Sequence, residues 1–343
     1  MPQHIALLTP AIGTGNVGDH FIERAICRLL DGDTVFHRFS VREPLRNADV
    51  AAINATDAAV LCGTNLYQYK WSLALTPALL DRIKVPVVPL GVGGSAAGLS
   101  DVAISEETRE MIVALHAHCE VGSVRDPFTA SVLEKVGVRN FQLTGCPVLL
   151  WSGGESLPSP ASMARDRVIL TARNFLMHHA PVNVDNPVQI ELMRQLLATF
   201  PTTQVRFPVH ESFDRNLVKL LHIDPAMVLD GEDVEEYLAI YSQPGYVVLA
   251  MRLHAGMLAL ANGLPVVFVG HDTRTYSFCQ MLGLDCVELF TPDCAAKCID
   301  GLRRKMRGDV ELPMATRHGF VECRTAMQQF LRANRLAVRS PVA

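Results

Sequence analysis

Short apolar runs and longer amphipathic stretches alternate along most of the chain. The run HIALLTP at residues 4–10 is followed by GDHFIERAICRLL, whose apolar residues recur at helical spacing, and then by TVFHRFSV. The first kind of segment predicts a buried strand, and the second predicts a helix that covers one face of a sheet. AAVLCG, VPVVPLGVGG and HCEVGSVRD repeat the strand pattern, and the helical ISEETREMIVALHAH lies among them. This alternation predicts parallel sheets with helices on both faces.

A second series of the same kind follows a break in the pattern. Residues 151–166, WSGGESLPSPASMARD, are rich in Ser, Gly and Pro and have no period, which is typical of a linker. Strand-like RVILTAR, TTQVRFPV, YVVLAM and PVVFVGH then alternate with helical QIELMRQLLATF and VEEYLAIYSQ. We therefore expect an α/β protein of two Rossmann-like, doubly wound domains facing a cleft, with the ligand site at the carboxyl ends of their strands.

The same patterns predict where the domains begin and end. We expect an N-terminal domain at residues 1–150, a linker at 151–166, a C-terminal domain at 167–315, and a C-terminal helix and tail at 316–343. The stretch RTAMQQFLRANRL has apolar residues at helical spacing, so we expect the chain to be helical from about Val310 and to pack back onto the first domain.

Composition and charge narrow the class of protein. The 31 Lys and Arg balance 35 Asp and Glu without any block of five like charges, so we expect no nucleic-acid partner. No uncharged run approaches the ~20 apolar residues of a membrane span, and MPQHIALLTP lacks the basic region of a secretory signal. The nine cysteines form no CxxC pair, so neither a zinc ribbon nor a disulfide framework follows, and we expect a soluble cytoplasmic protein.

The first loop, GTGNVGDH, follows a strand and opens a helix. Its glycines let backbone N–H groups approach a ligand at the positive end of the helix. Asn16 and Asp19 are the polar residues that we expect to face the cleft, and the alternative for Asp19 is a helix cap. In SVRDPFT, Arg125 ends a strand, where it reaches the cleft or forms an ion pair with a neighbouring carboxylate.

Residues 247–263, VVLAMRLHAGMLALANG, carry the sharpest signal. YVVLAM predicts a buried strand and HAGMLALANG a buried helix, so Arg252, Leu253 and His254 lie at the strand's carboxyl end, where ligands bind in open α/β sheets. An unpaired guanidinium among apolar residues costs several kcal/mol, so Arg252 needs an anionic partner. His254 supplies a group that titrates near neutrality. The alternative is a packed core histidine beside a paired arginine.

Several of these segments together resemble a known family. GNVGDHFIERA, SVRDPFTASVLEKVGV, TGCPVLL and RLHAGMLALANGLPVVFVGHDTRTYSFCQMLGL, in this order, are similar to the polysaccharide pyruvyltransferases. The resemblance implies a fold like the GT-B glycosyltransferases, with the acceptor on the first domain and the donor on the second. It also implies transfer of pyruvate from phosphoenolpyruvate onto two sugar hydroxyls as a cyclic ketal. The chain departs from the family pattern in GTNLYQYK, which is less glycine-rich, and in Arg274, where a lysine is frequent.

The residues suit this chemistry. Phosphoenolpyruvate carries a carboxylate and a phosphate, both matched by planar arginines, so Arg252 and Arg173 are candidate donor ligands. His254 is the candidate acid or base, and Asn16 and Asp19 face the acceptor's hydroxyls. Asn174 and His178 are weaker candidates. We expect no cofactor and no metal, because the pair His178 and His179 alone does not make a metal site.

The acceptor of the expected pyruvyl transfer is a carbohydrate, and a lipid-linked glycan would bring the protein into peripheral contact with a membrane.

Two other activities remain open. A glycosyltransferase that uses a nucleotide-sugar donor would need the same arginine and helix end. A sugar-binding protein without catalysis is the third reading.

Overall fold

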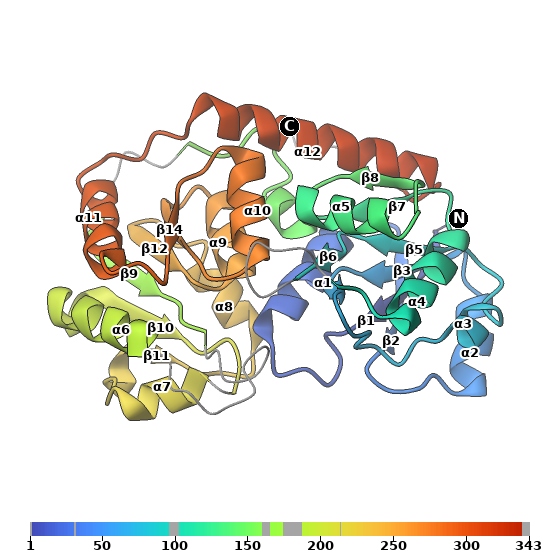
Figure 1. Cartoon of the computed structure of the whole chain (residues 1–343), viewed down its shortest axis with the longest axis horizontal. Helices are drawn as coiled ribbons and strands as arrows, with labels where there is room; N and C mark the ends of the chain where they lie inside the picture. The colour runs from blue at the N-terminus through green and yellow to red at the C-terminus, as the bar shows by residue number, and fades with distance from the viewer. Residues whose placement is uncertain are drawn as a thin grey trace.

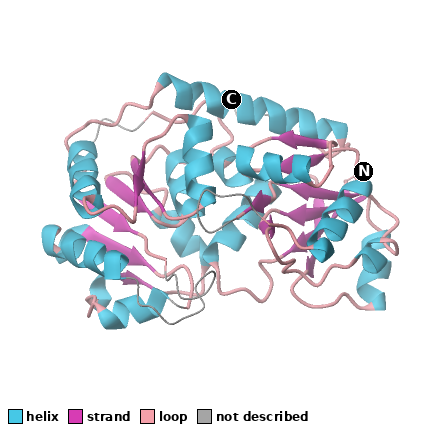
Figure 2. Ribbon diagram, in the orientation of Figure 1, coloured by secondary structure: helices cyan, strands magenta, loops and turns pink. Residues whose placement is uncertain are grey.

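The computed structural model describes residues 2–30, 32–95, 103–159, 165–173, 187–212 and 214–337. Two parallel sheets lie side by side with helices packed around each, and a long helix at the end of the chain passes over both (Figure 1). Figure 2 shows the strands of the two sheets as two separate magenta groups. The architecture is the predicted α/β fold with two Rossmann-like domains.

The first sheet has four parallel strands in the order β2-β1-β3-β5. These strands are β1 (His4–Thr9), β2 (Val35–Ser40), β3 (Ala58–Cys62) and β5 (Val87–Leu90). Two short parallel pairs extend this half: β4 (Asn65–Tyr67) with β6 (Gly93–Gly94), and β7 (Gly122–Val124) with β8 (Phe141–Leu143). Its helices are α1 (Val17–Leu29), α2 (Asn47–Asn54), α3 (Pro77–Leu80), α4 (Glu106–Ala117) and α5 (Pro127–Lys135). The short 3₁₀ helix η1 (Pro147–Leu150) ends this part of the chain.

The second sheet has six parallel strands in the order β11-β10-β9-β12-β13-β14. They are β9 (Arg167–Leu170), β10 (Val205–Pro208), β11 (Val228–Leu229), β12 (Tyr246–Ala250), β13 (Val266–Gly270) and β14 (Cys286–Glu288). Its helices are α6 (Pro187–Thr199), α7 (Asp214–Leu220), α8 (Val234–Ile240), α9 (Leu253–Ala261), α10 (Thr273–Leu282) and α11 (Cys294–Met306), with 3₁₀ turns η3 (Thr202–Gln204) and η4 (Pro225–Met227).

Strand β12 and helix α9 form the predicted buried strand and buried helix. All five residues of β12 are buried, and so is every residue of α9 except His254. Gly256 lets the helix approach the sheet closely, because a Cβ there would come within 2.7 Å of the Ala250 Cβ. A helix that is apolar on all sides needs cover on all sides, which places α9 between the two halves of the protein.

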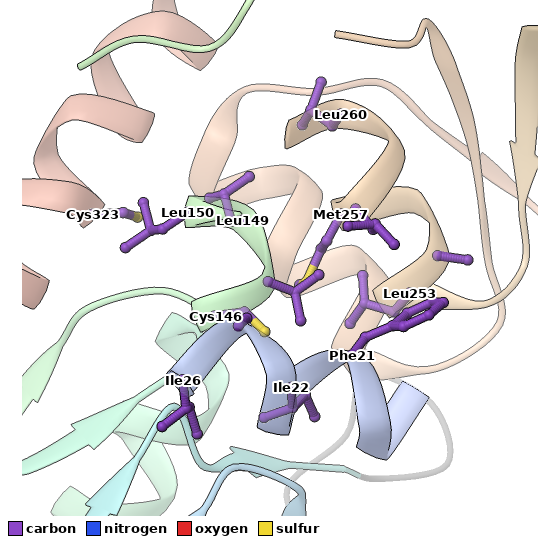
Figure 3. Packing of buried hydrophobic residues seen from close by; sticks show 14 of the residues in the cluster. Phe21, Ile22, Ile26, Cys146, Leu149, Leu150, Leu253, Met257, Leu260 and Cys323 are labelled. Atoms are coloured by element: carbon purple, nitrogen blue, oxygen red, sulfur yellow. The ribbon is translucent and has the colours of Figure 1, made fainter. Parts of the chain in front are cut away.

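The core between the two halves is continuous. Phe21 and Ile22 of α1, Leu149 of η1, and Leu253 and Met257 of α9 belong to one buried cluster (Figure 3). The interface therefore buries large apolar side chains, each worth ~1.5–3 kcal/mol when fully removed from water. This packing holds the first turns of α1 and α9 next to each other.

The C-terminal helix returns to the first half. The helix expected from about Val310 begins at Met314 and forms α12 (Met314–Ala333), because Pro313 at its N-cap position marks the start. Phe320 and Phe330 are buried, and Asn334, just after the helix, donates a hydrogen bond to the Val121 carbonyl at 2.9 Å. Helix α12 thus packs onto the half of the protein where the chain began.

None of the helices in the described ranges combines the length and the apolar character needed to cross a bilayer.

Candidate active site

A cavity of about 450 Å³ opens where the carboxyl ends of the two sheets face each other. Its walls are formed by residues that follow β1, β2, β3, β4 and β6 in the first half and β9, β10, β12 and β13 in the second. Among the described residues that line it, the ionisable ones are Asp19, Arg42, Arg173, His210, Glu211, Arg252, His254, His271 and Arg274. Four of these are arginines and two are carboxylic acids, so cationic side chains outnumber carboxylates on the wall itself, which suits an anionic ligand. Two further carboxylates, Asp214 and Asp272, pair with the arginines from behind the wall.

Arg252 lies at the N-cap of α9 and is held on three sides. Its Nε donates to the Ala172 carbonyl at 2.8 Å, Nη1 lies 2.9 Å from Glu211 Oε2, and Nη2 donates to Asp214. Burial opposes the charge on Arg252, but Asp214 and Glu211 outweigh it and raise its pKa. Arg252 therefore has the anionic partner that its burial requires. Glu211 binds its guanidinium and also lines the cavity.

The first turn of α9 presents backbone donors to the cavity. Arg252 makes no side-chain cap, so the N–H groups of Leu253, His254 and Ala255 are not satisfied by the N-cap residue. All three residues line the cavity. Uncapped amides at the positive end of a helix attract an anion.

His254 lies at the same helix end and is neutral there. Burial, together with the charges of Arg125 and Arg173, lowers its pKa to about 3. Its Nε2 is buried and has no hydrogen-bond partner among the described residues. The expected pKa near 7 is therefore wrong for the protein without ligand, because burial and, after it, the charges of Arg125 and Arg173 oppose protonation. In this state His254 can accept a proton.

Asp272 arranges two further arginines around the cavity. Arg173 Nη1 lies 3.2 Å from Asp272 Oδ2, and Arg274 donates to the same oxygen through Nε at 2.7 Å and through Nη2. Burial would raise the pKa of Asp272, but the hydrogen bond from His271 and the charge of Arg173 hold it below its usual value. The predicted Arg173 thus lines the cavity beside an arginine that the sequence analysis had noted only as a departure.

The first half contributes Asn16 and Asp19, as predicted for its loop. Asn16 is the N-cap of α1, since its Oδ1 accepts from the Gly18 N–H at 3.0 Å. The alternative that Asp19 caps the helix is therefore wrong. Asp19 lies in the first turn, where its Oδ2 accepts from Arg42 Nη2 at 2.7 Å and from Thr14 Oγ1 at 3.2 Å.

Arg125 does not line the cavity. It is 1 % exposed, and its Nε donates to Asp126 Oδ2 at 2.9 Å while Nη1 donates to Asn65 Oδ1 at 3.1 Å. Of the two readings of this arginine, the structure shows the ion pair. Its role at the site is indirect: it fixes Asn65, which does line the cavity, and its charge acts on His254.

Asn174, His178 and His179 lie outside the described residues. The residues that sequence reasoning missed are His210, Glu211, Asp214, His271, Asp272 and, as a cavity residue, Arg42. His210 and Glu211 follow β10, and His271 and Asp272 follow β13. The rule applied to RLH, that polar residues after a buried strand face the ligand site, would have found both pairs.

Comparison with known proteins identifies the family. The sequence profile of the polysaccharide pyruvyl transferases matches residues 16–273, most of the chain. The chain belongs to this family. No curated protein matches the sequence at a significant level. Family membership supports a transferase that acts in polysaccharide pyruvylation.

Solved structures share the fold. MnaA of S. aureus, determined with UDP, is 11% identical and superposes with a TM-score of 0.57, covering 99% of this chain and 100% of that chain. UDP-GlcNAc 2-epimerase from Neisseria meningitidis, bound to UDP-GlcNAc, is 10% identical with a TM-score of 0.53, covering 97% and 99%. At this identity the likeness supports the GT-B-like architecture and leaves the chemistry to the site.

Proposed function

We propose that this pyruvyl transferase moves the pyruvyl group of phosphoenolpyruvate onto two hydroxyls of one sugar, which forms a cyclic ketal and releases phosphate. The observation that carries the proposal is the cavity itself. It combines four arginines, an uncapped helix N-terminus and a neutral buried histidine, in a chain of this family. A small trianion and a proton-transfer reaction require this combination.

The donor would lie on the second half of the protein. Arg173 and Arg274 offer planar guanidinium groups from the loop after β9 and from the first turn of α10, and the amides of Leu253 and His254 offer donors from α9. Arg252 is already paired with Glu211, so a donor carboxylate would bind the guanidinium edge that faces the cavity. Phosphate at a helix N-terminus and carboxylate at an arginine are both favourable contacts.

The acceptor would enter from the first half. Thr64, Asn65, Gln68, Ser72 and Ser95 line that wall and carry hydroxyl or amide groups. Such side chains hydrogen-bond sugar hydroxyls without adding charge. We assign Asn16 and Asp19 to the same wall, and we place the carbohydrate, free or lipid-linked, against it.

His254 would act as the base. It is neutral without ligand because burial and the charges of Arg125 and Arg173 suppress its protonation, and an anionic donor would offset the two arginine charges. It can then hold the proton of the attacking hydroxyl.

The nine free cysteines favour a reducing compartment, so we place the reaction in the cytoplasm.

A nucleotide-sugar donor is the competing proposal, because a diphosphate would use the same arginines. Among the described residues lining the cavity there is no Phe, Tyr or Trp to stack on a base, which favours the smaller donor.

Thermal stability separates the two donors. We expect phosphoenolpyruvate to raise the melting temperature and UDP sugars to leave it unchanged. Phosphate release in the presence of phosphoenolpyruvate and a panel of glycans then tests transfer. Stabilisation by UDP sugars alone would replace pyruvyl transfer with glycosyl transfer.

A further inference from the structure

Asp19 combines two properties that conflict for an ordinary carboxylate. It lines the cavity, yet only 3 % of the residue is exposed. Both of its hydrogen bonds, from Thr14 and Arg42, end on Oδ2. A buried carboxyl with one oxygen held by donors can carry a proton on the other.

The charges around Asp19 come from both halves of the protein. Arg42, on the loop after β2, favours the ionised form, whereas Glu211, on the loop after β10, opposes it. Burial is the largest influence, and together these raise the pKa of Asp19 to about 6. His210 and His254 on the same cavity are driven the other way, to pKa values well below their usual range. Asp19 is thus a cavity carboxyl that titrates near neutrality.

Asp19 directly follows Gly18, a residue that packs against His254, and both Asp19 and His254 line the cavity. A Cβ built on the adjacent Gly18 would come 3.0 Å from His254 Nδ1, so the first turns of α1 and α9 touch. The other nitrogen of the imidazole, Nε2, is buried and has no hydrogen-bond partner in the described part of the chain. An acid from one half and a base from the other therefore share one cavity.

We propose that Asp19 is the proton donor to the donor's methylene carbon, and that His254 takes the proton of the attacking hydroxyl. The inference rests on the proposed function and names the second group that the reaction needs. Two hydroxyl protons must leave the sugar, and one proton must reach carbon, so a matched acid and base complete the reaction.

The protons gained and lost by Asp19 and His254 balance over one turnover. The Asp19 O–H bond breaks, and the C2=C3 electron pair of phosphoenolpyruvate forms the new C3–H bond, leaving an oxocarbenium ion at C2. The first sugar oxygen bonds to C2 as its proton passes to His254 Nε2. Phosphate then leaves with the electrons of its bond to C2 and takes the proton from His254. The second sugar oxygen bonds to C2, and its proton restores Asp19.

Binding of the donor should protonate Asp19. At pH 7 a group with a pKa of about 6 is about one-tenth protonated. A trianion that enters the cavity disfavours the carboxylate by charge repulsion and raises this fraction. Binding of phosphoenolpyruvate therefore takes up protons from the solution, with or without an acceptor.

Calorimetry measures this uptake directly. Phosphoenolpyruvate is titrated at pH 7 in buffers of different ionisation enthalpy, and the slope of the apparent enthalpy gives the number of protons bound. We expect the wild type to take up most of one proton and Asp19→Asn to lose most of that uptake while still binding phosphoenolpyruvate. Asp49→Asn is the matched control, because Asp49 is also a first-turn aspartate held by an arginine, but lies outside the cavity. It should leave the uptake unchanged.

The other possible results of this experiment would overturn either the assignment of Asp19 or the proposed donor. Equal uptake in Asp19→Asn and the wild type overturns the assignment, and so does loss of the whole uptake in His254→Gln. If Asp19→Asn does not fold, Arg42→Gln takes its place as the test variant. Removing the charge of Arg42 should raise the pKa of Asp19 and so move the proton uptake to higher pH. An unchanged pH dependence of the uptake would overturn the proposal. Failure of the wild type to bind phosphoenolpyruvate at all would instead reject the proposed donor.

Discussion

Gly18 in the first turn of α1 lies against the imidazole of His254 in the first turn of α9. A Cβ on Gly18 would lie 3.0 Å from His254 Nδ1 and 3.2 Å from Asn16 Oδ1, closer than side chains normally approach. The position of the base is therefore set by a glycine on the opposite half of the protein.

Gly18→Ala should displace His254 while leaving the arginines in place. We expect turnover to fall roughly tenfold to a hundredfold, because displacements of about 1 Å can cost that much, with little change in the Kd for phosphoenolpyruvate. Steady-state kinetics and calorimetry measure the two quantities. Gly15→Ala is the control, since Gly15 lines the same cavity and a Cβ there would meet nothing within 4 Å.

Arg252→Lys should weaken donor binding although it keeps the charge. A lysine cannot reach Ala172, Glu211 and Asp214 together, so the planar contact presented to the donor is lost. We expect the Kd for phosphoenolpyruvate to rise at least tenfold in a calorimetric titration. Arg215→Lys is the matched control, because Arg215 binds Asp230 through two nitrogens outside the cavity. Equal donor affinity in the Arg252 variant and the wild type would remove Arg252 from the donor site.

His254→Ala should lower turnover by ~10²–10⁴-fold, the usual contribution of a general acid or base, while the fold and most donor affinity remain. His4→Ala serves as the control, since His4 stacks on His37 away from the cavity. A wild-type rate in the His254 variant would make this residue a packed core histidine.

The buried histidines should make the protein less stable in acid. His116 accepts or donates to Tyr67 at 2.8 Å, and burial lowers its pKa to about 4. The unfolded chain, with a pKa near 6.5, binds this proton first, so the stability that His116 gives is complete above pH 6.5 and is lost as the pH falls towards 4. Asp19 has the opposite sign: its raised pKa adds stability as the pH falls from about 6 towards 3.8.

Urea denaturation at pH 7 and pH 5 isolates the contribution of His116. Its share of the loss between these pH values is about 2 kcal/mol. His116→Gln, which can still bond Tyr67, should reduce the pH dependence by about this amount. The same loss in variant and wild type would assign the acid sensitivity to other groups.

Gly93→Ala should destabilise the protein by ~1–3 kcal/mol through overpacking. A Cβ there would overlap the Arg125 guanidinium, 2.6 Å from Nη1, and Arg125 is fully buried and tied to Asp126. Chemical denaturation of this variant and of Gly15→Ala gives the comparison. An unchanged midpoint for Gly93→Ala would show that Arg125 can move aside.

The sequence predicted the fold and the location of the cavity because both depend on local patterns. The buried strand before Arg252 and the buried helix after it were readable from apolar runs alone. The ionisation of the site was not readable in this way. Burial and the charges of Arg125 and Arg173, which lie far from it in sequence, lower the pKa of His254, whereas burial and, more weakly, Glu211 raise that of Asp19.

The sequence also did not show which charged side chains form ion pairs with one another. Arg125 could have faced the cavity or a carboxylate, and only the packing of Gly93 against its guanidinium shows that it is enclosed. Arg252 was expected to need an anion, but Glu211 and Asp214 are some 40 residues away and follow a different strand. The sequence therefore indicated some of the residues that line the cavity, such as Arg252 and Arg173, whereas their partners and charge states required the three-dimensional arrangement.

The return of α12 to the first half has a consequence for biosynthesis. Phe320, Cys323 and Phe330 complete the same buried cluster as Ile5 and Leu7 of the first strand. While the chain emerges from the ribosome, the surface of the first half that α12 covers, on β7 and β8, has no partner until this helix has been made. Its apolar faces remain open to solvent during that interval, so the nascent protein is a natural client for a chaperone that shields exposed hydrophobic surface.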